Sequence, residues 1–204
     1  MSSGTDRAAS GSSRATPAAS RAGSTKQRIL AISRDLFARQ GFTGTTIADI
    51  ANELGTTTAA LYYHFPSKAD ILRGLLAEPM VAYARILDSM QTGQPSAAEL
   101  LDAFIDLAGD SRELAVIIDR DPAVLAMIEE FLPMTSEQMT EQVVDALAGP
   151  DADPAALIRA HAAFAVIKGA TMATMSIGAL DADGRLDPAY RAEILAAALR
   201  ALNR

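Results

Sequence analysis

The feature that most limits how this chain can fold is a rapid succession of helix starts and stops between residues 24 and 72. Ser24, Thr46 and Ser67 are each followed three residues later by Gln or Asp, the spacing of a capping box at a helix start. Gly41 and Gly55 follow the first two apolar helical repeats, and glycine at that position commonly ends a helix. The pattern predicts one longer helix followed by short helices joined by tight turns, which is helix-turn-helix spacing.

Composition supports a chain built from helices alone. Alanine accounts for 42 of the 204 residues and aromatic residues for only 5%, and alanine favours helices over strands. Half of the residues are hydrophobic, which is enough to bury a core. We therefore expect an all-α protein of about nine helices.

Several classes of function are disfavoured by what the chain lacks. It has no cysteine and only two histidines, which excludes thiol catalysis and leaves few ligands for a metal. No nucleophile with a neighbouring base and no phosphate loop is present, so we predict no enzyme activity, no metal and no cofactor. No apolar run approaches the roughly 18 residues of a membrane span, and the N-terminus has no hydrophobic segment. We expect a cytoplasmic protein without membrane contact.

Three regions are expected. Residues 1–23 are rich in Ser, Gly, Ala and Arg and predict a disordered tail. Residues 24–72 are expected to form the helix-turn-helix domain, and residues 73–204 a larger helical domain. The net charge of −7 is unevenly distributed, because residues 1–75 carry nine Lys and Arg against five Asp and Glu, whereas residues 76–204 carry nine against twenty. The first third is thus net basic, which suits a nucleic-acid partner.

The second short helix has the features of a DNA-recognition helix. Thr57 can cap it, and the small residues from Thr56 to Ala60, with Thr58 among them, would let its N-terminal end approach base edges in the major groove. Tyr62, Tyr63, His64 and Lys68 follow with hydrogen-bond donors suited to phosphate. The alternative is that Tyr62, Tyr63 and Phe65 are core aromatics. We assign Leu61 and Phe65 to the core and Tyr62 to the surface, and leave Tyr63 open.

The stretch from Thr25 to Leu72 resembles the DNA-binding domain of the TetR family of bacterial transcriptional regulators. The most specific block is LYYHFPSKADIL at 61–72, which follows DIA at 49–51. The resemblance implies a homodimeric repressor with a three-helix DNA-binding domain and a larger helical ligand-binding and dimerisation domain. It also implies phosphate or base contacts, which gives the full predicted DNA-binding set: Thr46, Thr57, Thr58, Ala60, Tyr62, Tyr63, His64 and Lys68. The chain departs from many relatives at Thr58-Ala59-Ala60, where a charge and a hydroxyl are missing, which shifts specificity toward methyl contacts and DNA shape.

Residues 155–180 are apolar nearly all round, which predicts a helix buried on most sides. The resemblance implies that this helix and the last one, near 188–202, pair with their copies in a dimer. The predicted dimer residues are Ile158, Ala162, Ala165, Gly169, Ala173, Ile194, Leu195, Ala198, Leu199 and Leu202. Apolar residues and an adjacent polar stripe could instead line a ligand cavity: Phe104, Ile118, Met127, Phe131, Met139, His161, Phe164, Lys168, Met172 and Met175. Periodicity does not separate the dimer face from the cavity or from plain core.

The function that these patterns favour is a ligand-responsive transcriptional regulator. We expect a repressor that binds double-stranded DNA at a palindromic operator and is released by a small apolar or amphipathic effector. The alternative is a dimeric small-molecule-binding protein with little or no sequence-specific DNA binding, for which the modest basic charge leaves room.

Overall fold

The computed structural model describes residues 17–93, 95–132, 134–177, 179 and 185–203. Within these ranges the chain is all helical, with no β-strand, as expected. The described residues form ten helices, against the nine or so expected: α1 (Pro17–Gln40), α2 (Ile47–Leu54), α3 (Thr58–His64), α4 (Lys68–Thr92), α5 (Ala97–Asp110), α6 (Arg112–Arg120), α7 (Ala123–Phe131), α8 (Ser136–Ala148), α9 (Pro154–Ile177) and α10 (Pro188–Leu202).

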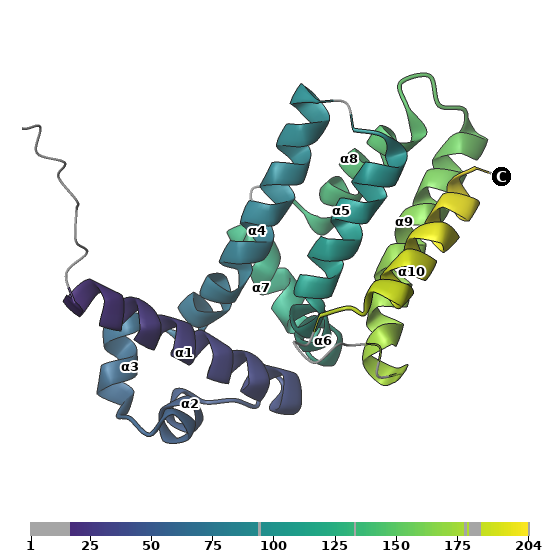
Figure 1. The fold of residues 1–204 in the computed structure, drawn as a ribbon. Helices are drawn as coiled ribbons and strands as arrows, with labels where there is room; N and C mark the ends of the chain where they lie inside the picture. The colour runs from purple at the N-terminus through teal and green to yellow at the C-terminus, as the bar shows by residue number, and fades with distance from the viewer. Residues whose placement is uncertain (1–16, 94, 133, 178, 180–184, 204) are drawn as a thin grey trace, which may run out of the picture.

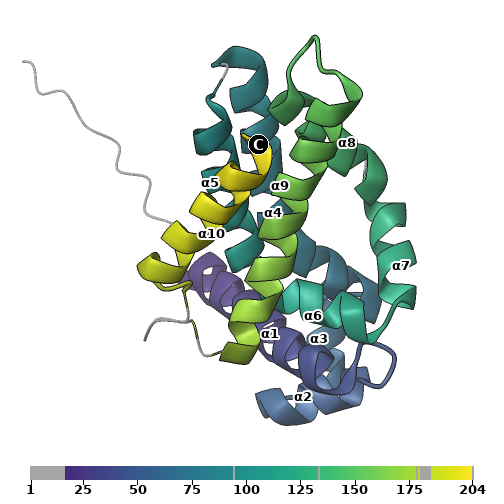
Figure 2. The ribbon, with the colours of Figure 1, turned by 90° about the vertical axis from the view of Figure 1, so that its right-hand side faces the viewer.

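The helices divide into a small base and a tall bundle. Figure 1 shows α1 lying across the base with α2 and α3 beneath it, and α4 rising from the base into the bundle. In the bundle, α4, α5, α9 and α10 stand roughly upright. Figure 2 shows α6 close to α1, and α7 linking this region to α8. The base is therefore held from above by the helices of the larger region.

Local capping explains most helix ends. Thr46 and Ser96 form capping boxes with Asp49 and Glu99, and the Ser67 hydroxyl accepts a hydrogen bond from the Asp70 N–H. These hydrogen bonds satisfy backbone donors that the first helical turn leaves free. The hydrogen bonds from Thr46 also lower the pKa of Asp49, and those from Ser96 lower the pKa of Glu99.

Two glycines end helices in the left-handed region. Gly41 follows α1 with φ of 79°, and Gly55 follows α2 with φ of 69°. A residue with a Cβ is strained in this conformation, so glycine is the natural choice at both positions. The predicted stops after α1 and α2 are confirmed.

One local expectation is wrong. The first helix begins at Pro17 rather than at Ser24, so residues 17–23 are helical and Ser24 lies inside α1 instead of capping it. Proline suits a first helical turn and the following alanines favour the helix, which accounts for the earlier start. Residues 1–16, the rest of the expected tail, lie outside the described residues.

Buried apolar side chains form two clusters, here called the first core and the second core. The first core lies under α1–α3 and the start of α4, and includes Phe37, Ile50, Leu61 and Phe65. The second core lies among α4, α5, α8, α9 and α10. It contains the neighbouring rings of Tyr83, Phe104 and Phe164 together with the aliphatic residues Ile105, Val143, Ile167 and Ile194.

Helices α6 and α7 contribute to the first core, although they lie far along the sequence. Ile117 and Val124 are fully buried in it, and Ile128 is 4% exposed. The predicted domain boundary at residue 72 thus marks the end of the sequence motif, while the packing that supports the motif also draws on residues 112–131.

Candidate nucleic-acid interface

The exposed face of α3 contains most of the predicted DNA contacts. The Thr57 hydroxyl accepts a hydrogen bond from the Ala60 N–H and caps the helix, and Thr58, Ala59 and Ala60 are exposed. Leu61 is buried in the first core, which anchors the helix. The outward end of α3 is therefore narrow and free of large side chains, which suits close approach to base edges.

The tyrosines on α3 point away from the core. Tyr62 is 51% exposed and Tyr63 is 86% exposed, while Phe65 is buried. The assignments of Leu61, Tyr62 and Phe65 are confirmed, and the open question about Tyr63 is settled in favour of the surface. The Tyr63 ring buries little of its surface against this chain. Its apolar face and its hydroxyl are therefore available to a partner.

His64 ends α3 and is half buried, with its ring edge-on to Tyr63 at 5.3 Å between centroids. Thr46 lies at the start of α2 and is exposed, but its hydroxyl already donates to Asp49 Oδ2 at 2.7 Å. Thr46 is thus a helix cap first. A phosphate contact from its side chain would require that hydroxyl to change partners.

Lys68 has a different role from the one that the sequence suggested. Its ammonium group donates to the carbonyl oxygens of Phe42 and Thr45, both at 2.7 Å, and lies 4.3 Å from the centroid of the Phe42 ring. Partial burial lowers the pKa of Lys68, an effect opposed by the nearby carboxylate of Asp121. Lys68 therefore ties the turn between α1 and α2 to α4, with two of its donors occupied inside the chain.

Polar contacts from α6 fasten this unit to the rest of the chain. Arg34 on α1 pairs with Glu113 at 2.9 Å, and Arg120 donates to the Arg39 carbonyl at 2.7 Å. The Thr43 N–H donates to Asp121 Oδ2 at 2.8 Å, which lowers the pKa of Asp121. These contacts could not be predicted from sequence motifs, because the paired residues lie some 80 positions apart in the chain.

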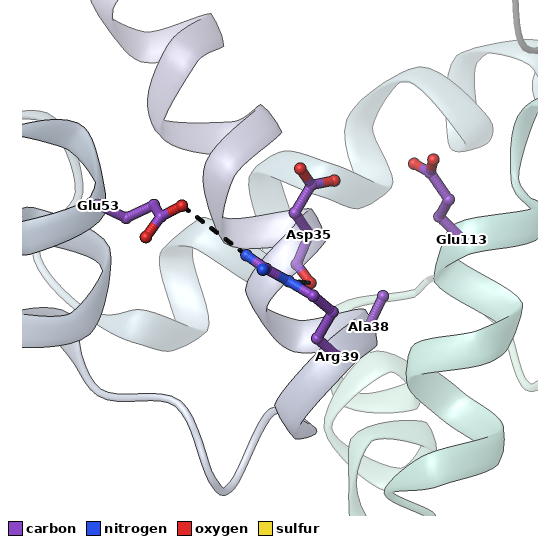
Figure 3. Close-up of a pocket in the computed structure, with 5 residues that line it drawn as sticks. All are labelled: Asp35, Ala38, Arg39, Glu53 and Glu113. Carbon is purple, nitrogen blue, oxygen red and sulfur yellow. Dashed lines mark hydrogen bonds and ion pairs between the residues drawn. The ribbon is translucent and has the colours of Figure 1, made fainter.

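An acidic surface groove lies at the C-terminal end of α1. It is lined by Asp35, Ala38, Arg39, Glu53 and Glu113. Figure 3 shows Arg39 turned toward Glu53, 3.9 Å away, with the Asp35 and Glu113 carboxylates pointing elsewhere. Three carboxylates against one guanidinium in the groove make this side of the base unsuited to DNA phosphate.

The predicted ligand-lining residues do not come together around one cavity. Phe104, Met139 and Phe164 pack in the second core, whereas Ile118, Met127 and Phe131 pack against the first core. His161 and Lys168 are exposed on α9 rather than turned inward. Met172 is half buried, and the side chain of Met175 lies outside the described residues. The two surface hollows, one beside Asp35, Arg39 and Glu113 and one beside Lys26, His64 and Arg73, both lie outside the second core.

The predicted dimer residues separate into two groups. The residues from α9 are all exposed: Ile158, Ala162, Ala165, Gly169 and Ala173. In α10, Ile194 and Ala198 are buried in the chain's own second core, and Leu195, Leu199 and Leu202 pack partly against it. The α10 residues were misassigned in part because α9 and α5 already cover the inner face of that helix.

Helix α9 corrects another expectation. By length and composition, the segment from Pro154 to Thr174 is long and apolar enough to cross a membrane. Only 22% of its most apolar 18-residue stretch is buried within the chain. The expectation that no stretch approaches a membrane span is therefore wrong. The composition and the exposure together describe an apolar face that the single chain leaves uncovered, including Ile158 at 69% and Ile177 at 60% exposed.

Comparison with known proteins shows which family the region that contains this interface resembles. Residues 29–75 match the family described as "Bacterial regulatory proteins, tetR family". The HTH-type transcriptional repressor KstR2 of Rhodococcus jostii (strain RHA1) is 32% identical over 120 residues, which cover 57% of this chain and 58% of that protein. The match thus spans somewhat more than half of the relative's length.

Solved structures share the whole fold. A TetR-family transcriptional regulator from Bordetella parapertussis 12822 superposes with a TM-score of 0.62 and 21% identity, covering 88% of this chain and 94% of that one. A transcriptional regulator from Saccharomonospora viridis in complex with choline superposes with a TM-score of 0.55 and 23% identity, covering 84% and 94%. At this level of identity the likeness establishes the fold.

Proposed function

We propose that this chain, whose residues 29–75 match the tetR family of bacterial regulatory proteins, is a transcriptional repressor that binds a palindromic DNA operator as a homodimer. It would leave the operator when a small molecule binds the larger domain. The observation that carries the proposal is the face of α3. Small capped residues at its start are followed by two exposed tyrosines, on a helix anchored by the buried Leu61.

The DNA contacts divide by chemistry. Thr57, Thr58 and Ala60 are placed to approach base edges, where threonine can donate, accept or pack its methyl group on thymine. Tyr62, Tyr63 and His64 present donors for phosphate oxygens. Few direct base hydrogen bonds are available on this face, so we expect much of the specificity to come from DNA shape.

The exposed stripe on α9 supports the homodimer. Its small side chains allow close approach of a second helix, and the apolar residues at its two ends gain by leaving water. A twofold axis that runs along this stripe, roughly parallel to α9, would place two copies of α3 on one side of the assembly. Two copies of α3 related by a twofold axis read a palindrome with half-sites about one helical turn of DNA apart, or slightly more.

The effector would act by favouring a dimer whose two recognition helices no longer fit neighbouring grooves. Helix α4 is the natural lever, because it begins beside α3 and ends in the second core. The polar contacts of Arg34, Arg120 and Asp121 provide a second connection from α6 to the base. The apolar composition of the second core suggests an apolar or amphipathic effector. The choline complex of the Saccharomonospora viridis regulator is an instance of a small organic ligand on this fold.

The proposal is tested by selection from random DNA. Purified full-length protein is mixed with a library of random duplexes, and bound DNA is recovered and sequenced over several rounds. We expect enrichment of a palindrome. A library that stays random would contradict the proposal and favour a dimeric small-molecule-binding protein without sequence-specific DNA binding.

A further inference from the structure

A surface cleft beside the recognition helix lies where α1, α3 and α4 meet. It is lined by Lys26, His64, Phe65, Pro66, Asp70, Arg73 and Gly74, and its volume is about 270 Å³. His64 brings the last turn of α3 to its wall. Lys26 comes from α1, which contains none of the predicted DNA-binding residues.

The charges in this cleft leave one cation available. The Asp70 carboxylate is occupied on both oxygens, by Arg73 Nη1 at 2.6 Å and by the Ser67 hydroxyl at 2.7 Å. The Lys26 ammonium lies 5.1 Å from the centroid of the Phe65 ring and has no carboxylate partner in the part of the chain that the structure describes. An exposed lysine on an aromatic floor next to an imidazole is a donor set that suits an anion.

Close packing fixes the geometry of the cleft. A Cβ on Gly74 would lie 2.9 Å from Leu30 Cδ2 and 3.1 Å from Phe65 Cε1. The absence of a side chain therefore lets α4 approach α1 and holds the Phe65 ring under Lys26. Phe65 is 3% exposed and is the C-cap residue of α3, directly after His64. The floor of the cleft is therefore tied to the C-terminal end of the recognition helix.

The two surface hollows of the base have opposite charge. The groove at the far end of α1 combines three carboxylates with Arg39, whereas this cleft combines Lys26, His64 and an Arg73–Asp70 pair. We propose that the cleft seats a phosphate group of the DNA backbone, with Lys26 donating from α1 and His64 from α3. The inference rests on the proposed function and adds α1 to the DNA-contacting surface.

The test compares Lys26→Gln with Arg28→Gln. Both residues are exposed on α1, but two positions along a helix turn a side chain to nearly the opposite face, so Arg28 is a matched charge control outside the cleft. The affinity of each full-length variant is measured by fluorescence anisotropy against a labelled duplex of random sequence over a series of salt concentrations. Circular dichroism checks the fold.

We expect Lys26→Gln to bind more weakly and to lower the slope of log affinity against log salt. The slope should fall by about 1 for each phosphate that is no longer neutralised, hence by about 2 for a dimer. Lys26→Arg should restore the slope, and Arg28→Gln should keep the wild-type value. An unchanged slope in Lys26→Gln, or an equal fall in Arg28→Gln, would overturn the inference. Wild-type protein that fails to bind duplex DNA at all would instead refute the proposed function, which is a different result.

Discussion

The first core and the second core support surfaces of opposite character. Above the first core, α3 presents hydroxyls, phenols and an imidazole, and the neighbouring side chains are held by hydrogen bonds such as those of Lys68 and Asp121. Above the second core, α9 presents an exposed stripe of alanines, a glycine and isoleucine with little hydrogen-bonding capacity, and His161 and Lys168 are exposed beside it. A polar surface rich in hydrogen-bond donors suits a partner rich in phosphate oxygens, whereas an apolar stripe suits a second copy of the same helix. Under the proposed function, the first region would bind DNA and the second would form the dimer.

The largest expected effect tests whether α6 belongs energetically with the first core. Ile117 on α6 and Ile105 on α5 are both fully buried, the former in the first core and the latter in the second. We expect either change to alanine to lower the free energy of unfolding by about 2–5 kcal/mol, measured by urea titration. Only Ile117→Ala should speed hydrogen exchange in α1–α3. Equal exchange in α1–α3 for the two variants would mean that the chain has one cooperative core.

A second substitution probes the apolar stripe. Ala165→Arg places a charge on the exposed face of α9, opposite its own copy in a twofold dimer, and we expect dimerisation weaker by roughly a hundredfold or more by sedimentation velocity. Ala84→Arg, on the exposed side of α4, is the control and should leave the association unchanged. Wild-type-like dimers of Ala165→Arg would show that another surface holds the two chains together.

The third prediction concerns the recognition helix. Because Tyr63 is 86% exposed, Tyr63→Ala should leave the thermal midpoint nearly unchanged and weaken operator binding by about 10- to 100-fold, the range of one good contact. Tyr190→Ala, at an exposed position of α10, is the matched control. If both variants bind operator DNA as wild type does, the exposed face of α3 is not the reading surface.

The smallest effect is a pH dependence at the junction between the two regions. Hydrogen bonding by Thr43 lowers the pKa of Asp121 below the ordinary aspartate value of 3.8. A lowered folded-state pKa gives stability that is present above the ordinary value and is lost as the pH falls through the folded-state pKa. Asp121→Ala should therefore melt below wild type at pH 7, and the difference should close below about pH 3.8. Asp119→Ala, which removes another exposed carboxylate of α6, is the matched control and should melt close to wild type at pH 7.

The sequence was most informative where local chemistry decides the structure. Thr46, Thr57 and Ser67 cap their helices because a hydroxyl near free N–H groups is favourable in almost any context. Gly41 and Gly55 end theirs because few other residues tolerate a positive φ. The same local signals placed α3, and with it the exposed tyrosines.

The sequence was least informative where a face had to be assigned. The repeats in 155–180 and 188–202 are so rich in alanine that several stripes look alike, and only the packing shows that Ile194 and Ala198 face inward while Ala162 and Ala165 face outward. The contacts that Lys68 makes within the chain could not be predicted for a related reason. Its two carbonyl partners come from a turn more than 20 residues away, and no spacing rule predicts such a contact.

The proposed separation of DNA binding on α3 from dimerisation on α9 can be tested most directly through the two histidines, because one lies in each region. His64 ends the recognition helix and His161 lies exposed on α9. Their imidazole resonances are assigned by NMR with single His→Gln variants and followed while a duplex selected from random DNA is added to wild-type protein. The account predicts that the His64 signal shifts with DNA and the His161 signal does not. An unmoved His64 signal, or equal shifts of both, would contradict it.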